Sequence, residues 1–199
     1  MTDLLRAMLP SPVTIAVVGA AALALGGCAA WVVARLRVRG VRVAYTRKVF
    51  HFTIFTAAAV VHATWDLAGT VVFGMVIAAL VLAAVRRWEG DGFYEALARD
   101  SDRPHRSLFI LVPLVTTAVG GLASALLAGP HAAVGYLAAG WGDAVGGPVG
   151  ARWGRHPYRV PSLAGVPATR TLEGSFAVFL MASAGSAAAL GSLGDAPWW

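Results

Sequence analysis

The sequence predicts an all-α, polytopic integral membrane protein with about six transmembrane helices. Of its 199 residues, 58% are hydrophobic and only 13% are charged, which is far more apolar than a soluble globular domain. The apolar residues form long blocks instead of alternating with polar ones. The basic residues gather in short segments between these blocks, as in proteins that cross a membrane several times. We therefore expect a single transmembrane domain over residues 1–199.

Each predicted span is an apolar run of up to about twenty residues bounded by charged residues, proline or aromatic anchors. The predicted spans are Val13–Val33, Val49–His62, Leu67–Val85, Leu108–Leu127, Ala132–Val149 and Leu172–Leu193. The first is too long for the core of a signal peptide, so we expect it to be retained. The second is short, and we expect Arg47, Lys48 and Trp65 to anchor it at the interfaces.

The loops predict the orientation of the chain. Fifteen of the sixteen Lys and Arg residues lie in the segments that follow the first, third and fifth spans, whereas the intervening turns contain none. The positive-inside rule makes the basic side cytoplasmic and places both termini outside a cell membrane. Because the arginines lie in short loops between spans, the net charge of +6 does not predict a nucleic-acid partner. The longest loop, residues 86–106, predicts a solvated connector with a short surface helix at Phe93–Ala98, and its acids are secondary candidates for metal binding.

The main candidate site lies around Asp143, near the cytoplasmic end of the fifth span. Ionisable residues inside a membrane are costly and usually face a protein-lined cavity, so Asp143 predicts a ligand site. Glycines follow it at helical offsets of three, four, seven and eleven: Gly146, Gly147, Gly150 and Gly154. For the glycines alone, close helix packing is the alternative interpretation. Pro148 predicts a kink beside this site.

Two further groups of polar residues reach the same predicted membrane face. Glu173 begins the sixth span, where it is either a second ligand or an ordinary acid in the first helical turn, capped by Thr169 or Thr171. Arg47, Lys48 and His51 lie at the start of the second span, with Arg47 and His51 on one helical face. Arg and Lys suit phosphate binding and His suits proton transfer, although the basic pair is equally explained as a topological anchor.

Taken together, the three groups resemble the polyprenol kinase family, which includes dolichol kinase and phytol kinase. The pattern RKxxH is Arg47 to His51, the pattern GDxxxxxxGxxxG runs from Gly142 to Gly154, and [KR][ST]xEGS runs from Arg170 to Ser175. The resemblance covers roughly residues 40 to 185, which would form the core of the site.

The resemblance implies a membrane enzyme that transfers the terminal phosphate of a nucleoside triphosphate, typically CTP, to an isoprenoid alcohol within the bilayer. In that hypothesis Asp143 and Glu173 hold Mg²⁺ and, with His51 and Lys48, form the catalytic group. The expected nucleotide and phosphate contacts are Arg47, Gly142, Gly146, Gly150, Arg152, Arg170, Thr171 and Ser175.

Two other functions fit parts of the same pattern. A lipid cytidylyltransferase would share the nucleotide and the membrane but would release pyrophosphate. A small-solute transporter would also place an acid in a broken, glycine-rich helix. The sequence contains no GxxxxGK[ST], HExxH, GxSxG or CxxC pattern, so soluble kinases and zinc or serine hydrolases lack their key residues here.

Overall fold

The computed structural model describes residues 9–161 and 163–193 and confirms the all-α class. Its long helices are α2 (Pro12–Val38), α3 (Val43–Arg87), α5 (Leu108–Ala128), α6 (Ala132–Trp153) and α7 (Leu172–Leu193). The shorter elements are helix α4 (Gly92–Leu97), the 3₁₀ turns η1 (Asp100–Asp102) and η2 (Gly129–His131), and strands β1 (Pro157–Val160) and β2 (Ala168–Thr171). The two strands pair in an antiparallel hairpin that the sequence analysis did not predict.

Four helical segments of the described chain are long and apolar enough to cross a membrane, which indicates a multi-pass membrane protein. They are Pro12–Val38, Val43–Arg87, Leu108–Trp153 and Leu172–Leu193. The prediction of six separate spans is therefore corrected to four long apolar helical segments, two of which contain a reversal of the chain. The second and third predicted spans belong to one helix, and the fourth and fifth belong to one nearly continuous helical segment.

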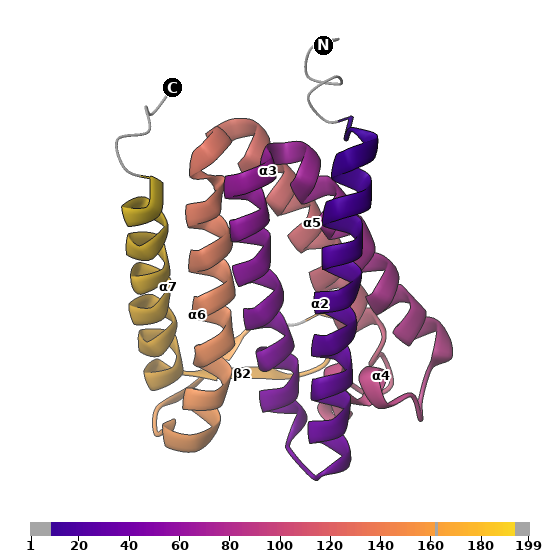
Figure 1. Cartoon of the computed structure of the whole chain (residues 1–199). Coiled ribbons are helices and arrows are strands. Elements are labelled where there is room, and N and C mark those ends of the chain that lie inside the picture. Colours follow the sequence, from indigo (N-terminus) through magenta and orange to yellow (C-terminus); the bar gives the residue numbers. More distant parts are fainter. Residues whose placement is uncertain (1–8, 162, 194–199) are drawn as a thin grey trace.

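The physical reason for this difference lies in two very short turns. Helix α3 departs from helical geometry at Asp66, with φ 51° and ψ −153°, and the chain turns back on itself there, as the upper part of Figure 1 shows. The second turn is η2, where Gly129 adopts φ 52°, a backbone conformation that favours glycine. The chain thus reverses at the polar residues between the predicted spans. The helical structure is interrupted there for only a few residues.

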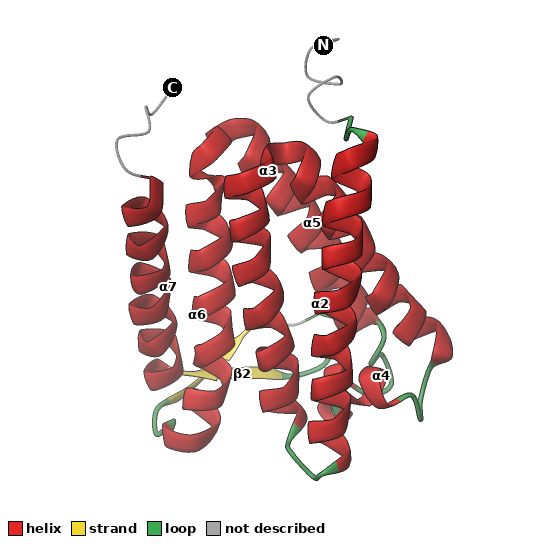
Figure 2. Cartoon of the chain, in the orientation of Figure 1, coloured by secondary structure: helices red, strands yellow, loops and turns green. Residues whose placement is uncertain are grey.

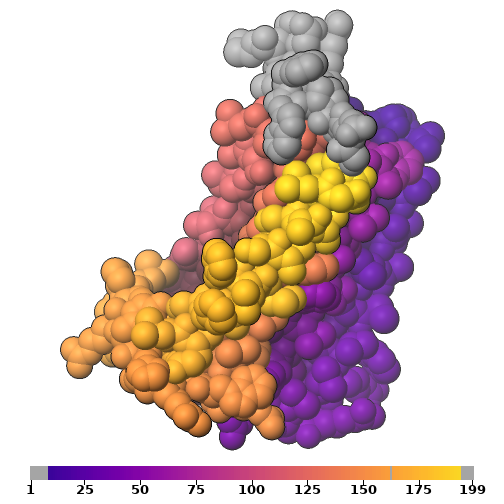
Figure 3. Space-filling view, turned by 90° about the vertical axis from the view of Figure 1, so that its left-hand side faces the viewer, coloured from indigo at the N-terminus to yellow at the C-terminus, as the bar shows by residue number. Residues whose placement is uncertain are grey.

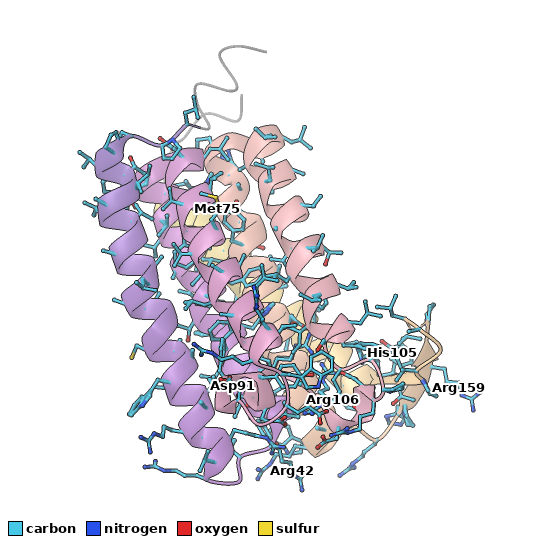
Figure 4. All side chains as sticks on the ribbon, turned by 90° about the vertical axis from the view of Figure 1, so that its right-hand side faces the viewer. Arg42, Met75, Asp91, His105, Arg106 and Arg159 are labelled. Carbon is cyan, nitrogen blue, oxygen red and sulfur yellow. The ribbon has the colours of Figure 1, made fainter. Side chains whose placement is uncertain are left out.

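The helices lie side by side, with the start of α2 and the end of α7 at one end of the bundle (Figure 1). Helix α7 packs along α6, and both α6 and α2 pack against α3. The α2–α3 turn, α4 and the strands gather at the opposite end (Figure 2). Seen from the α7 side, the segment that contains β1 and β2 projects beyond the helices (Figure 3). This end also carries Arg42, Arg106 and Arg159 (Figure 4).

Helix α4 closes this end of the bundle. It begins at Asp91, whose side chain accepts hydrogen bonds from the backbone amides of Phe93 and Tyr94, so it coincides closely with the predicted surface helix. Tyr94 is fully buried, and Thr46 of α3 donates a hydrogen bond of 2.7 Å to the carbonyl of Ala96. The interpretation of residues 86–106 as a solvated connector is therefore wrong, because much of the segment is packed against α2 and α3.

The acids of this segment have structural partners. Buried Arg106 donates to Glu95 at 2.7 Å and to Glu89 at 3.0 Å. The Arg106 guanidinium lowers the pKa of the Glu95 carboxyl below its usual value. Within the described part of the chain, no three His, Cys, Asp or Glu side chains form a group that could hold a metal ion. The structure thus gives these acids roles in holding α4 in place.

Candidate functional site

Asp143 of α6 points toward α3 and meets two of the predicted site residues there. The Lys48 Nζ lies 2.6 Å from the Asp143 Oδ2, and the His51 Nε2 lies 3.4 Å from the same oxygen. Lys48 and His51 can share this partner because residues three apart lie on the same face of a helix. The structure therefore brings together three predicted catalytic residues from helices that are about ninety residues apart in the sequence.

The two side chains of the Lys48–Asp143 ion pair differ in burial. The Lys48 side chain is only 10% exposed, whereas the Asp143 side chain is 58% exposed. A buried ammonium needs an opposite charge, and Asp143 supplies it. Both contacts use the Oδ2 atom of Asp143, so Oδ1 is not part of them. The His51 ring packs against the Phe55 ring at a centroid distance of 4.2 Å, which fixes its position on α3.

Arg47 adds a second cation to this cluster and links it to other segments. It is half-buried, and the charges of four residues act on it: Arg99, Asp102, Asp143 and Arg170. These residues come from the α4–α5 connection, from α6 and from β2. Charged groups from four parts of the chain thus converge at the basic end of the bundle, where a polyphosphate would find several cations.

A cavity opens beside the cluster. It has a volume of about 160 Å³, and Arg47, His51 and Asp143 are its charged or titratable lining residues. The remainder of its lining is mostly apolar and includes Phe55 and Leu114. A second, almost wholly apolar cavity of about 360 Å³ lies deeper in the bundle. The two cavities share part of their lining: Ile54, Phe55, Ile77, Leu114 and Thr117.

Glu173, the other predicted magnesium ligand, has a different partner from Asp143. Its Oε1 lies 2.6 Å from the Nδ1 of His156, and its Oε2 accepts a 3.4 Å hydrogen bond from the His156 backbone amide. His156 lies just beyond the end of α6, so this pair ties the start of α7 to the segment before β1. Asp143 is thus the carboxylate that contacts Lys48, and Glu173 contacts His156 instead. The predicted pairing of Asp143 with Glu173 around a magnesium ion stays a prediction.

The predicted phosphate-binding glycines lie in the contact between α6 and α7. A Cβ added at Gly146 would approach the Gly174 carbonyl oxygen at 3.2 Å, and one at Gly142 would approach the Val178 carbonyl oxygen at 3.2 Å. A Cβ at Gly150 would lie 2.8 Å from the Thr171 Oγ1. These distances support the alternative interpretation of close helix packing. A role of Gly142, Gly146 and Gly150 in phosphate binding stays a prediction.

Thr171 and Ser175 are engaged in local structure. The Thr171 Oγ1 accepts a 3.1 Å hydrogen bond from the Gly174 amide, as expected for a helix cap. The Ser175 Oγ donates to the Thr171 carbonyl at 3.1 Å and can then accept from the Tyr158 hydroxyl at 2.6 Å. Both residues therefore hold the β-hairpin against the first turn of α7, and their predicted contact with phosphate stays untested.

The hairpin separates its arginines onto two faces. Arg170 pairs with Tyr158 in the strand register, and Arg159 pairs with Thr169. Because successive strand residues point to opposite faces, Arg170 and Arg159 lie on different faces of the ribbon. Arg170 is the one whose charge acts on Arg47. Arg152, another predicted phosphate contact, is exposed and lies over the neighbouring Trp153 ring at 5.3 Å.

Sequence reasoning missed His156 and Tyr158, which hold Glu173 and Ser175. A signal for them was present, because Tyr158–Val160 and Ala168–Thr171 flank a segment that contains Pro161, Gly165 and Pro167. Such turn residues between short runs of strand-forming residues are typical of a hairpin. Comparisons of the chain with protein-family models, curated proteins and solved structures found no match. Its function is therefore inferred from the side chains and cavities described above.

Proposed function

We propose that this protein is a membrane-embedded kinase that transfers the terminal phosphate of a nucleoside triphosphate to an isoprenoid alcohol. The observation that supports it is the meeting of Lys48, His51 and Asp143 beside a cavity that shares part of its lining with a larger apolar cavity. Phosphoryl transfer needs cations and in-line positioning, which the charged cluster supplies. A lipid acceptor needs an apolar space next to the reacting group, which the apolar cavity supplies. The choice of CTP rests on the resemblance to polyprenol kinases.

In this proposal Arg47, Lys48 and Arg170 bind the triphosphate. Arg47 lines the same cavity as His51 and Asp143, Arg170 is close enough for its charge to act on Arg47, and Lys48 exchanges part of its contact with Asp143 for a phosphate oxygen. Cations that act on developing phosphate charge in a water-poor site give a large share of catalysis. Arg159 lies on the opposite face of the hairpin and has no such role, which makes it the matched control for Arg170.

The reaction is a direct transfer to the alcohol. The alcohol oxygen forms a bond to the terminal phosphorus, and the bond from that phosphorus to the bridging oxygen breaks, with its electron pair leaving on the nucleoside diphosphate. His51 accepts the alcohol proton at Nδ1, and Asp143, whose Oδ2 lies 3.4 Å from Nε2 on the other side of the ring, stabilises the resulting imidazolium. Bound Mg²⁺ would neutralise charge on the phosphates, with Asp143 as its protein ligand, since this ion often uses one or two carboxylates together with substrate phosphates.

The proposed topology places the basic end of the bundle in the cytoplasm. Arg42, Arg106 and Arg159 lie at this end, opposite the start of α2 and the end of α7 (Figures 1 and 4). A straight helix of 45 residues would measure about 68 Å, more than twice the roughly 30 Å hydrocarbon core of a bilayer. The turn at Asp66 lets both halves of α3 fit within one membrane. The nucleotide then reaches the site from the cytoplasm and the alcohol reaches it from the bilayer.

The test uses membranes that contain the full chain, γ-labelled CTP or ATP, and a panel of farnesol, geranylgeraniol, phytol and longer polyprenols. The proposal expects a labelled lipid monophosphate and release of the nucleoside diphosphate. Asp143→Asn should abolish the product while Arg159→Gln retains it. Release of pyrophosphate with a nucleotide-linked lipid would instead identify a cytidylyltransferase. If no lipid product forms with any alcohol, or Asp143→Asn turns over normally, the kinase proposal fails.

A further inference from the structure

The apolar cavity deep in the bundle has the properties of a site for one hydrocarbon chain. Its volume is about 360 Å³, and it lies between the second half of α3, α5 and α6. Small-ligand pockets span roughly 300–1,000 Å³, so this volume suits a single chain better than two. One of its few polar lining groups, the Tyr136 hydroxyl, already donates a 2.9 Å hydrogen bond to the Gly121 carbonyl. A hydrocarbon therefore meets few unsatisfied polar groups in this cavity.

The cavity is open toward the lipid-facing surface of the bundle. Met75 lines it and is 58% exposed, and Figure 4 shows Met75 on the face where the second half of α3 lies beside α5. At Gly74, also in the lining, an added Cβ would have no neighbour within 4 Å. Gly74 is exposed, so the edge of the cavity carries no side chain at this position of α3, and both α3 and α5 belong to candidate membrane spans.

This cavity shares part of its lining with the smaller cavity at the charged cluster. Phe55 and Leu114 line both this cavity and the smaller one that Arg47, His51 and Asp143 border. A molecule with a long apolar tail and a small polar head could therefore place its tail beside Gly74 and its head at His51. A two-chain lipid would have to leave one chain outside.

We infer that the acceptor alcohol enters from the bilayer between the second half of α3 and α5. Its single hydrocarbon chain then occupies the apolar cavity lined by Gly74. The inference rests on the proposed function for the identity of the head group, a primary alcohol. It assigns chain selection to this cavity, with Gly74 as the residue that keeps it open. Short alcohols reach His51 without using the cavity, so only longer chains depend on Gly74.

Another apolar groove, separate from both cavities described above, provides a matched control. It lies between α2 and the first half of α3, has a volume of about 810 Å³, and is lined by Ala21, Leu25 and Val60 among others. None of Arg47, Lys48, His51 or Asp143 is in its lining. Ala21→Leu places a leucine side chain in this groove as Gly74→Leu does in the proposed cavity, with a net addition of three carbons instead of four.

The test measures binding directly, with the full chain in lipid nanodiscs and a farnesyl alcohol that carries a terminal diazirine. After illumination, mass spectrometry locates the labelled peptides, which should come from residues 67–81 and 114–122. Gly74→Leu should reduce labelling about tenfold, since excluding about two methylene groups from an apolar site changes affinity by that order. Ala21→Leu should label like the unmodified protein, and both variants should elute as single species in size-exclusion chromatography.

The outcomes separate this inference from the proposed function. Labelling in residues 17–25 would overturn the proposed hydrocarbon-chain site at Gly74, even if the protein phosphorylates farnesol. Equal labelling of the Gly74→Leu and Ala21→Leu variants would overturn it as well. Labelling at 67–81 and 114–122 that Gly74→Leu removes supports the chain site even if no alcohol is phosphorylated, in which case the kinase proposal alone fails. In the activity assay, Gly74→Leu should lower turnover of farnesol but not of a five-carbon prenyl alcohol.

Discussion

Lys48 and Asp143 form an ion pair of 2.6 Å that joins α3 to α6 at the basic end of the bundle. Lys48 is nearly buried and Asp143 remains more than half exposed, so the pair both compensates a buried charge and leaves the carboxylate accessible. Mutating either residue therefore changes the stability of the protein together with any activity that the kinase proposal assigns to the pair. The experiments must measure the two separately.

A double-mutant cycle separates these effects for the pair. We expect Asp143→Asn to destabilise the protein because it leaves the Lys48 ammonium without its counter-charge, whereas Lys48→Gln combined with Asp143→Asn recovers part of that loss. The coupling free energy should fall between about 0.5 and 3 kcal/mol, as for other contacting pairs. The measurement is thermal unfolding in detergent of the wild type, both single variants and the double variant. Strictly additive effects would show that the two side chains do not interact.

Two histidines in α3 should behave in opposite ways. His62 is buried, and its ring nitrogens lie 3.0 Å from the Thr70 Oγ1 and 2.9 Å from the Gly129 carbonyl oxygen, so it joins the turn at Asp66 to the turn at η2. We expect His62→Ala to lower stability by about 1–3 kcal/mol, the cost of unsatisfied buried polar groups. His51→Ala should leave the unfolding temperature nearly unchanged and, if the kinase proposal holds, remove the activity. A stable His62→Ala variant, or a fully active His51→Ala variant, would contradict these assignments.

The glycines of α6 should be sensitive to packing. An alanine at Gly146 would press on α7 near Val178 and Gly174, whereas an alanine at Gly120 of α5 would meet nothing within 4 Å. We expect Gly146→Ala to destabilise the protein and Gly120→Ala to be neutral or to stabilise it by up to about 1 kcal/mol through helix propensity. Unfolding temperatures in detergent test this comparison. Equal tolerance of both changes would argue against a close α6–α7 contact at Gly146.

The sequence was sufficient to predict the helical class and the polar end of the bundle, because long apolar blocks and basic loops follow directly from the physics of a bilayer. It also placed Lys48 and Asp143 at similar membrane depth. The number of separate helices could not be read from it, since the predicted break between His62 and Leu67 is a turn at Asp66 so short that one helix, α3, spans it. The partner of Glu173 was also hidden, because it depends on a hairpin that brings back His156 from seventeen residues earlier.

The two faces of the hairpin give a prediction about nucleotide binding. Arg170 acts on Arg47 near the cluster, whereas Arg159 is on the other face of the same ribbon. If the kinase proposal holds, Arg170→Gln should raise the KM for the nucleoside triphosphate about tenfold, which corresponds to the loss of roughly 1.4 kcal/mol of binding. Arg159→Gln should leave KM within experimental scatter. Steady-state kinetics with variable nucleotide and saturating alcohol measure both, and a similar effect of the two variants would show that only total charge matters.

The pair between Glu95 and Arg106 should make stability depend on pH. The Arg106 hydrogen bond lowers the pKa of Glu95 in the folded protein below its usual value of 4.5, so the folded state binds this proton less readily than the unfolded state. The contribution is therefore fully present above about pH 4.5 and is lost as the pH falls through the lower, folded-state pKa. Unfolding temperatures of the wild type and Glu95→Gln should differ at pH 7 and converge once the pH is below the folded-state pKa. In an Arg106→Gln background the same Glu95→Gln change should have little pH dependence, and a difference that persists unchanged at low pH would show that the carboxylate charge is not the source of the effect.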